Sequence, residues 1–239
     1  MKTIAIDRGN TNTKVGVFQN DLLKVVHLLD LPQLANFVVE QLPDHVIMSS
    51  VLPLTKKERE ALLTLLPNIL FVNKNLKLPI SLDYDTPETL GADRIAAMVG
   101  SRKYVSGDAL VIDAGSCTTY DWLDHLNIYR GGLITPGRKM RSRAMNAQTG
   151  ALPLIEINDN FGLIGKSTSS CINNGIQIGS IAEMNGIISE FKNKIPKLSV
   201  ILTGGDALFF EKQLEIDSFV VSNLVLEGLN AILSVNVGV

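Results

Sequence analysis

Near its start the chain reads Ile4-Ala5-Ile6-Asp7-Arg8-Gly9-Asn10-Thr11-Asn12-Thr13-Lys14. The same outline returns as Val111-Ile112-Asp113-Ala114-Gly115-Ser116-Cys117-Thr118-Thr119-Tyr120. In each copy a short apolar strand ends in Asp-x-Gly and small polar residues follow. A turn of glycine and small polar residues can direct several backbone N–H groups at one point, where they hold phosphate oxygens. The chain therefore reads as two copies of one phosphate-binding half.

Such a duplication predicts an α/β fold made of two ribonuclease-H-like halves, in the class of the sugar kinases, Hsp70 and actin, with a nucleotide cleft between the halves. The turn residues Ser106-Gly107-Asp108 precede the second set of strands, which places the expected division there. We expect an N-terminal half over residues 1–106, with the first phosphate loop and a Gly-Ala-Asp-Arg motif. A C-terminal half over residues 107–239 would carry the second phosphate loop and a Thr-Gly-Gly-Asp motif.

The composition is that of a globular protein, with 46% apolar and 19% charged residues in 239. Twenty-two basic and 24 acidic residues leave a net charge of -2, so neither nucleic acid nor a membrane is an expected partner. Only Cys117 and Cys171 are present, which favours a reducing compartment. No apolar run approaches transmembrane length. We expect a cytoplasmic protein.

The hydrophobic pattern predicts strands and helices that alternate along most of the chain. Strands are expected over residues 3–7, 14–18, 22–29, 45–50, 69–72, 109–113, 118–123, 128–134 and 199–203. Helices are expected over residues 32–42, 55–66, 86–104, 168–194 and 224–233, and residues 73–86 read as a loop. Thr86-Pro87-Glu88 has the cap, proline and acid of a helix start. Gly91 would then lie inside a helix, where glycine costs about 1 kcal/mol relative to alanine.

The first phosphate loop would run from Gly9 to Thr13. Asp7, at the end of the strand, would hold Mg²⁺ through water, and Lys14 would add positive charge near a terminal phosphate. The alternative is a hairpin with ordinary turn residues. The second copy of the pattern favours the phosphate loop.

The second half offers two further candidates. Asp113 to Ser116 would contact the same nucleotide from the opposite side, and Gly204-Gly205, between a strand and a helix, would let an adenine or ribose approach the backbone. Each is also compatible with a simple turn. A basic cluster, Arg138, Lys139, Arg141 and Arg143, would steer an anionic substrate or form a solvated basic face, and the sequence favours the solvated face.

The segment Gly91-Ala92-Asp93-Arg94 carries two charges that point in different directions on a helix, so they are not expected to pair with each other. In the functional interpretation Asp93 is a base that orients an acceptor hydroxyl, and Arg94 grips a substrate carboxylate. In the alternative, each pairs with another residue on a solvated helix face.

Five short motifs occur in one order. They are Asp7-x-Gly-Asn-Thr, Gly91-Ala-Asp-Arg94, Asp113-x-Gly-x-x-Thr-Thr-x-Asp121, Gly131-Gly-Leu-Ile-Thr-Pro-Gly137 and Thr203-Gly-Gly-Asp-Ala207. Together they are highly specific, and over nearly its full length the chain resembles the type III pantothenate kinases. This family of transferases phosphorylates pantothenate with ATP, the first committed step of coenzyme A biosynthesis.

The resemblance implies roles for individual residues. The ATP phosphates would bind to Asp7, Arg8, Gly9, Asn10, Thr11, Asn12, Thr13 and Lys14. The proton acceptor would be Asp93, and the pantothenate pocket would be lined by Tyr84, Gly91, Ala92, Asp93, Arg94 and Thr168. Asp113 matches the position that holds an activating monovalent cation, K⁺ or NH₄⁺. Ser116 matches a nucleotide-contacting threonine, and Gly204 and Gly205 lie on the adenosine side.

The resemblance also implies a homodimer, and two departures from the family pattern accompany it. Ser116-Cys117 stands where the family usually has Thr-Ala, and serine keeps the hydroxyl. Cys171-Ile-Asn-Asn follows Thr168 in place of the common Ala-Met-Gln-Ser.

Two alternatives to the kinase remain open at this point. One is a non-catalytic nucleotide-binding regulatory or accessory protein of the same fold, against which the presence together of Asp7, Asp93, Arg94 and Asp113 argues. The other is an actin-like or Hsp70-like ATPase, for whose extra subdomains the short chain leaves little room.

Overall fold

The computed structural model describes residues 1–10, 12–72 and 76–238. The chain forms two compact units, each built from separate segments of sequence. Unit 1 contains Met1–Ser106, Leu123–Gly131 and Asn223–Val239, and unit 2 contains Gly107–Trp122 and Gly132–Ser222. One division therefore follows Ser106, but two later segments of the predicted C-terminal half belong to unit 1.

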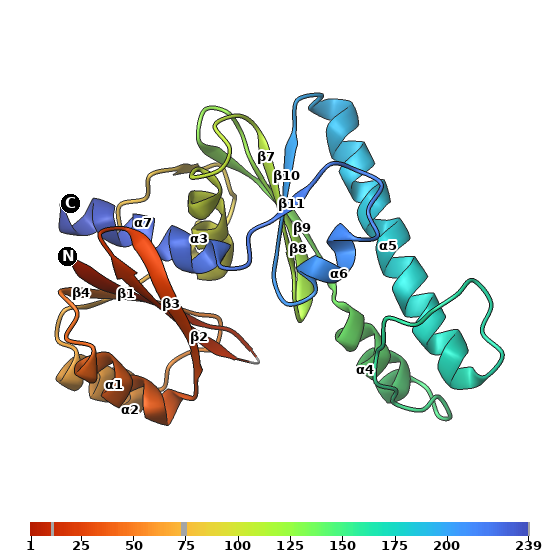
Figure 1. Ribbon diagram of the computed structural model, residues 1–239, viewed down its shortest axis with the longest axis horizontal. Coiled ribbons are helices and arrows are strands. Elements are labelled where there is room, and N and C mark those ends of the chain that lie inside the picture. Colours follow the sequence, from red (N-terminus) through yellow and green to blue (C-terminus); the bar gives the residue numbers. More distant parts are fainter. Residues whose placement is uncertain (11, 73–75, 239) are drawn as a thin grey trace. The chain divides into compact units, whose positions relative to one another are not determined.

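The sheet of unit 1 has five strands in the order β3-β2-β1-β4-β5 (Figure 1). Its strands are β1 (Lys2–Arg8), β2 (Thr13–Gln19), β3 (Leu22–Leu29), β4 (His45–Ser50) and β5 (Ile69–Phe71). β1 to β3 form an antiparallel meander, whereas β4 runs parallel to both β1 and β5. Because parallel strands end at the same edge, Asp7 at the end of β1 lies opposite Ser49 at the end of β4.

Helices cover both faces of this sheet. Side chains alternate along β1, so Ile4 and Ile6 pack with α1 (Leu31–Glu40) and α2 (Lys56–Leu65) in one apolar cluster. Thr3, on the opposite face, donates a hydrogen bond from Oγ1 to Asn230 Oδ1 over 2.5 Å. Asn230 belongs to α7 (Leu224–Val237), which packs against α3 (Ala92–Ser101) and against β1. The C-terminal helix thus completes the core of unit 1.

The predicted helix from Thr86 to Tyr104 is two separate elements. A short 3-10 turn, η1, covers Pro87–Thr89, Leu90 is extended, and α3 begins only at Ala92. The Thr86 side chain makes no capping hydrogen bond. The prediction that Gly91 lies inside a helix is therefore wrong, because Gly91 is the residue that precedes α3. A side chain there would overlap Oδ1 of Asp93, which is a better reason for glycine than helix propensity.

The second sheet repeats the strand order of the first. It reads β11-β10-β7-β8-β9, with β6 added beyond β9. The strands are β6 (Ser81–Leu82), β7 (Ala109–Ala114), β8 (Cys117–Leu123), β9 (Ile128–Pro136), β10 (Ser199–Thr203) and β11 (Phe219–Val220). On one side of β7 lie the next two strands along the chain, β8 and β9. On its other side lie β10 and β11, which run parallel to it. β1 has β2 and β3 on one side and the parallel β4 and β5 on the other in the same way. This agreement supports the duplication read from the sequence.

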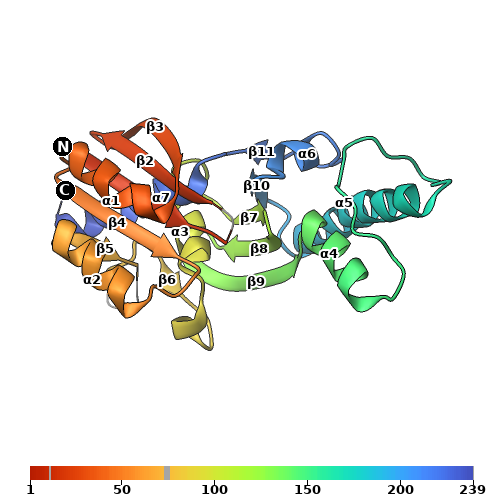
Figure 2. The same cartoon turned by 90° about the horizontal axis from the view of Figure 1, so that it is seen from below.

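The helices of unit 2 are α4 (Arg138–Gln148), α5 (Thr168–Lys194) and α6 (Ala207–Glu211) (Figures 1 and 2). Leu110 and Ile112 of β7 pack with Met184 and Ile188 of α5 and with Phe210 of α6. α5 matches its predicted bounds, whereas α4, β6 and β11 were not predicted. β6 and β11 have two residues each, too few for an alternation pattern. None of the helices in the described ranges combines the length and apolar character needed to cross a membrane.

Candidate active site

Two carboxylates and one ammonium group converge at the end of β1 in unit 1. Asp7 lies across the β1–β2 ladder from Lys14, and Asp93 lies in the first turn of α3. The pKa of Asp7 is raised, mainly by burial and further by the Asp93 carboxylate. A hydrogen bond from Ser49 and the charge of Lys14 act in the opposite direction and lower it. The Asp93 carboxylate disfavours the charged form of Asp7, and a divalent cation bound beside them would relieve this repulsion. The site therefore fits Mg²⁺.

Ser49 is a site residue that the sequence did not reveal. Its hydroxyl donates to Asp7 Oδ1 over 2.9 Å, and the side chain is buried at 1% exposure. Only the pairing of β4 with β1 brings the two residues together, across 42 positions of sequence. A signal was present in the small polar pair Ser49-Ser50, which follows the apolar strand residues of β4 as Asp7 follows those of β1.

The predicted phosphate loop lines a cavity of about 290 Å³ in unit 1. Its lining includes Arg8, Gly9, Asn10, Asn12 and Thr13, whereas the predicted contact Thr11 lies outside the described residues. The Gly9 N–H closes the turn by donating to the Asn12 carbonyl over 3.0 Å.

Arg8, which lines this cavity, provides a second indication that the cavity binds an anion. One nitrogen, Nη2, lies 3.4 Å from Glu58 Oε1. The other, Nη1, is buried and has no hydrogen-bond partner among the residues that the structure describes. A buried donor of this kind is costly unless something accepts its hydrogen bond, and a phosphate oxygen would do so.

An aromatic and cationic cluster lies beside the start of α3. The Tyr84 and Tyr129 rings are 5.8 Å apart, and the Arg94 guanidinium carbon is 6.0 Å from the Tyr129 ring centre. Arg94 and Tyr129 are both buried. The solvated helix face considered for Arg94 is therefore wrong, and Tyr129 joins the cluster without having been predicted. Gly91, Ala92 and Asp93 precede Arg94 directly, so the predicted pocket residues of unit 1 are grouped.

Unit 2 brings together three other predicted residues. Gly204 has φ +90°, and a side chain there would overlap Asp113 Oδ1 and press on the Ala114 carbonyl oxygen. The Asp206 N–H donates to that carbonyl over 2.9 Å, and the Ser116 carbonyl accepts from the Gly137 N–H over 3.2 Å. The loop that ends β7 is therefore packed against the loop that follows β10.

Two remaining predicted residues of unit 2 have more open surroundings. A Cβ at Gly205 would meet no atom within 4 Å, so a ligand has room to approach the backbone there. Thr168 is the exposed first residue of α5, after a capping box between Ser167 and Ser170. Thr168 belongs to unit 2, whereas the other predicted pocket residues belong to unit 1.

The predicted cation position, Asp113, offers oxygen atoms of a suitable kind. Its carboxylate and the Ala114 carbonyl oxygen both lie against Gly204, and hard cations take oxygen ligands. Within the described ranges no three or more His, Cys, Asp and Glu side chains form a metal-binding group. A single carboxylate with a backbone carbonyl fits a weakly held monovalent ion.

The four basic residues of the cluster on α4 differ in how exposed they are and in whether they pair with a carboxylate. Lys139 and Arg143 are exposed. Arg141 Nη2 lies 2.7 Å from both carboxylate oxygens of Glu183 on α5. Arg138 is buried and pairs with two aspartates. The predicted solvated face therefore holds for the exposed members and is wrong for Arg138.

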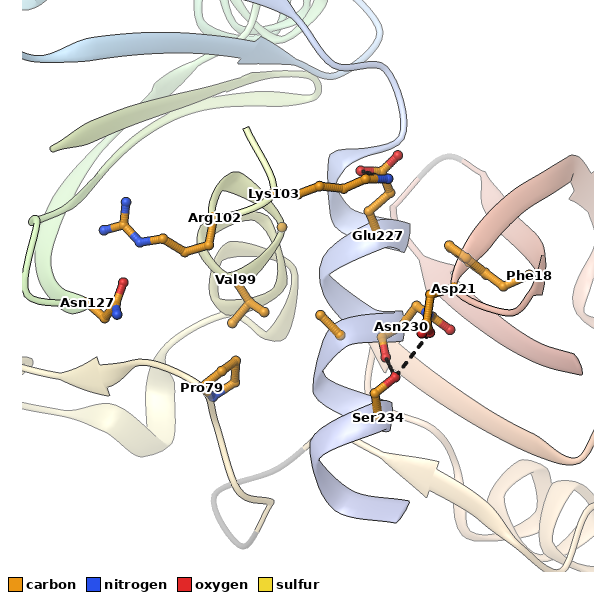
Figure 3. A pocket seen from close by; sticks show the side chains of 12 residues that line it. Phe18, Asp21, Pro79, Val99, Arg102, Lys103, Asn127, Glu227, Asn230 and Ser234 are labelled. Atoms are coloured by element: carbon orange, nitrogen blue, oxygen red, sulfur yellow. Dashed lines mark hydrogen bonds and ion pairs between the residues drawn. The ribbon is translucent and has the colours of Figure 1, made fainter. Parts of the chain in front are cut away.

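A separate cavity of about 520 Å³ lies on α3 and α7 in unit 1 (Figure 3). Its charged lining is already paired within the protein, as Lys103 Nζ lies 3.3 Å from Glu227 Oε2 and Asn230 donates to Asp21. None of the predicted site residues lines it. The candidate site therefore rests on its chemistry and not on cavity size.

Comparison with known proteins gives the sequence a family. Residues 3–190 match the family model described as type III pantothenate kinase. A type III pantothenate kinase of Cytophaga hutchinsonii is 40% identical over 236 residues, covering 98% of this chain and 99% of that one. A type III pantothenate kinase of Phocaeicola vulgatus is 39% identical over 240 residues, covering 98% of each.

Comparison with solved structures addresses the fold alone, because these proteins are distant in sequence. A Campylobacter jejuni protein, provisionally described as a Baf family transcriptional activator, is 22% identical with a TM-score of 0.65, covering 99% of this chain and 100% of that one. The ROK hexokinase of Thermus thermophilus is 12% identical with a TM-score of 0.50, covering 97% and 98%. The predicted α/β fold of the sugar kinase, Hsp70 and actin class is confirmed.

Proposed function

The chain belongs to the type III pantothenate kinase family, and on that premise we propose that it transfers the γ-phosphoryl group of ATP to the primary hydroxyl of pantothenate. The products are 4′-phosphopantothenate and ADP. The observation that carries the proposal is the interaction of Asp7 with Asp93 and Lys14 at the strand end from which the first phosphate loop continues, a loop that itself lines a cavity. A phosphoryl-transfer site needs this combination of metal-binding carboxylate, positive charge and base.

Asp93 acts as the base. Its carboxylate accepts the proton of the pantothenate hydroxyl as the bond to phosphorus forms, and it orients that hydroxyl before the reaction. Its Oδ1 also accepts the Arg94 backbone N–H over 2.9 Å, which fixes the carboxylate in the first turn of α3. Gly91 leaves the space that this orientation needs.

The negative charge of the phosphates would be neutralised by Arg8, by Lys14 and by the metal ion that Asp7 holds. Asp7 would hold Mg²⁺, which neutralises charge on the phosphate oxygens when it is bound. Arg8 and Lys14 place positive charge at the same end of the β1–β2 pair, on opposite faces of the sheet. Because the transition state is loose, we expect most of the rate to come from alignment and charge neutralisation, with no phosphoenzyme.

Arg94 would grip the pantothenate carboxylate, as a planar guanidinium binds a carboxylate through two parallel hydrogen bonds. Tyr84 and Tyr129 form an aromatic wall beside it. Thr168, Gly91 and Ala92 would complete the pocket. In unit 2, Ser116, Gly204 and Gly205 would contact the nucleotide, and Asp113 would hold K⁺ or NH₄⁺.

The proposal extends to a homodimer that works in the cytoplasm, as expected from the resemblance and from the cysteine content. The non-catalytic regulator is not favoured, because the catalytic carboxylates and the substrate-gripping arginine are all present. The likeness to the Campylobacter jejuni protein concerns the fold and carries no argument for a regulatory role.

The test is coupled ADP release by the purified protein with Mg²⁺-ATP, with and without pantothenate, in potassium and then in sodium buffer. Release that requires pantothenate establishes the kinase, and dependence on potassium supports the cation site. ADP release without pantothenate would favour an ATPase. No release by a folded sample under any of these conditions would favour the non-catalytic regulator.

A further inference from the structure

Arg138 is a buried charge that the proposed reaction does not yet use. It is the first residue of α4, directly after the Gly131–Gly137 motif, and its side chain is 9% exposed. The guanidinium carbon lies 3.7 Å from the centre of the Phe209 ring. A charge held this far from water needs acceptors, since an unpaired buried guanidinium is strongly unfavourable.

Three acceptors surround the guanidinium group, and they come from different parts of unit 2. Nη1 donates to Asp159 Oδ1 over 2.9 Å and to Gln177 Oε1 over 3.0 Å. Nη2 donates to Asp206 Oδ1 over 2.6 Å. The planar fork of arginine suits this arrangement because its donors point in fixed and different directions.

Of these partners, Asp206 has the most direct link to ligand binding. It follows Gly204 and Gly205 and directly precedes α6, whose start its side chain does not cap. Its backbone N–H donates to the Ala114 carbonyl over 2.9 Å. Asp206 is therefore fixed at two points, by β7 through its backbone and by Arg138 through its side chain.

The other end of the connection also reaches the second phosphate loop. Gly137, directly before Arg138, donates from its N–H to the Ser116 carbonyl over 3.2 Å. A side chain at Gly137 would overlap the Gly115 carbonyl oxygen. The loops around residues 115, 137 and 205 thus pack together, and Arg138 joins the second of them to the third.

We propose that Arg138 is a positioning residue for the nucleotide: through Asp206 it holds Gly204-Gly205 at the place where the adenosine portion of ATP binds. The inference rests on the proposed function, because the role of Gly204-Gly205 belongs to that proposal. Without Arg138 the turn loses its side-chain anchor while the Asp206 backbone bond to β7 remains. The loop then samples positions that do not match the nucleotide, and affinity falls before folding fails.

The experiment measures ADP binding directly, by calorimetry on the full chain with Mg²⁺, so that it does not depend on turnover. Arg138→Met and Asp206→Asn should each raise the Kd for ADP by about tenfold, as expected for loss of one charge-assisted hydrogen bond. The double variant should be no weaker than the weaker single variant, because both changes break one connection. Arg138→Lys should recover part of the affinity, since it keeps the charge but loses the fork.

Two controls separate positioning from general support. Asp159→Asn removes another partner of Arg138, one that is 68% exposed and does not belong to the glycine loop. Arg143→Met removes an exposed charge from the same helix. Both should keep the Kd within about twofold of wild type. Melting temperatures by circular dichroism identify variants that are unfolded at the assay temperature.

The outcomes divide clearly. Unchanged ADP affinity in folded Asp206→Asn, additive effects in the double variant, or an equal loss in Asp159→Asn would each overturn the positioning role. No ADP binding by folded wild-type protein would overturn it together with the nucleotide site. ADP binding by wild type without pantothenate-dependent turnover would contradict only the proposed function, and the Kd comparison would still decide the role of Arg138.

Discussion

The two sheets have the same strand order but place different chemistry at the end of their first strand. At β1 the aspartate shares its surroundings with a second carboxylate, Asp93, and its pKa is raised. At the end of β7, Asp113 lies against Gly204. The carboxylate of Asp206, in the same turn as Gly204, is paired with Arg138. Under the proposed function, one half of the duplicated fold would carry the phosphoryl-transfer chemistry and the other would hold the nucleotide in place. Function in this fold resides in the residues added to each copy and not in the copy itself.

The test with the largest expected effect replaces Asp93, the proposed base in unit 1. Asp93→Asn keeps the size and the hydrogen bond of the side chain but removes its ability to accept a proton. We expect kcat to fall by about 10²–10⁴-fold with little change in melting temperature. Coupled ADP release with pantothenate measures the loss, and exposed Glu88→Gln, in the turn before α3, is the matched control. Turnover close to wild type in the purified variant would remove Asp93 from this role.

A second test compares glycines in the two loops. Gly204→Ala places a Cβ into Asp113 and Ala114 at φ +90°, and we expect it to lower the free energy of unfolding by about 2–3 kcal/mol. Gly205→Ala meets no atom within 4 Å, and at Gly9 the nearest atom is 3.4 Å away, so both should cost less than about 1 kcal/mol. Urea titration measures all three. Equal losses at positions 204 and 205 would show that the loop after β10 is not tightly packed.

A third test concerns the cost of keeping Asp7 charged. Because its pKa is raised in the folded protein, the folded state binds a proton more readily than the unfolded chain. Stability is then greatest below the ordinary carboxylate pKa and decreases as the pH rises through the raised pKa. Asp7→Asn should therefore melt at a higher temperature than wild type at pH 8 without Mg²⁺ or nucleotide, and the gap should close toward pH 4.

The same variant should be inactive at every pH, since the amide cannot hold the metal as a carboxylate does. Exposed Asp85→Asn is the control for the melting experiment and should show no pH-dependent gap. If Asp7→Asn melted below wild type at pH 8, the carboxylate would be stabilising, and the contrast with the second half would be lost.

The smallest expected effect is that of replacing Ser49. Ser49→Ala removes the hydroxyl that donates to Asp7, which is the larger of the two contacts that lower the Asp7 pKa. The pKa should rise further, so the acid limb of kcat/KM measured at subsaturating Mg²⁺ should move to higher pH. Ser50→Ala, whose hydroxyl donates to the Leu52 carbonyl, should leave that limb unmoved. An identical profile for the two variants would exclude Ser49 as a partner that tunes Asp7.

The sequence predicted the duplication, the order of the main strands and the loops at their ends, because local periodicity and turn residues encode these features. Asp7 interacts electrostatically with Lys14 and Asp93, and the catalytic roles that the motifs suggested for these residues stay predictions. The start of α3 was misjudged because Thr86-Pro87-Glu88 begins a short 3-10 turn, without a side-chain cap, and the extended Leu90 separates that turn from the helix.

Residues whose roles depend on distant partners could not be predicted. Ser49 meets Asp7 only through the β1–β4 pairing, and Tyr129 meets Arg94 only once β9 is in place. Arg138 stands among other basic residues, a pattern typical of a surface. Its burial depends on acceptors at residues 159, 177 and 206, which no local pattern connects to it.

The hydrogen bond from Thr3 to Asn230 joins residues 227 positions apart, and it sets a constraint on the order of events during translation. Strand β1 leaves the ribosome well before the helix that covers one face of it. All of unit 2 is synthesised between them. We therefore expect the nascent chain to carry an open apolar sheet face until α7 has been synthesised, and chaperones that recognise such faces to bind unit 1 and not unit 2.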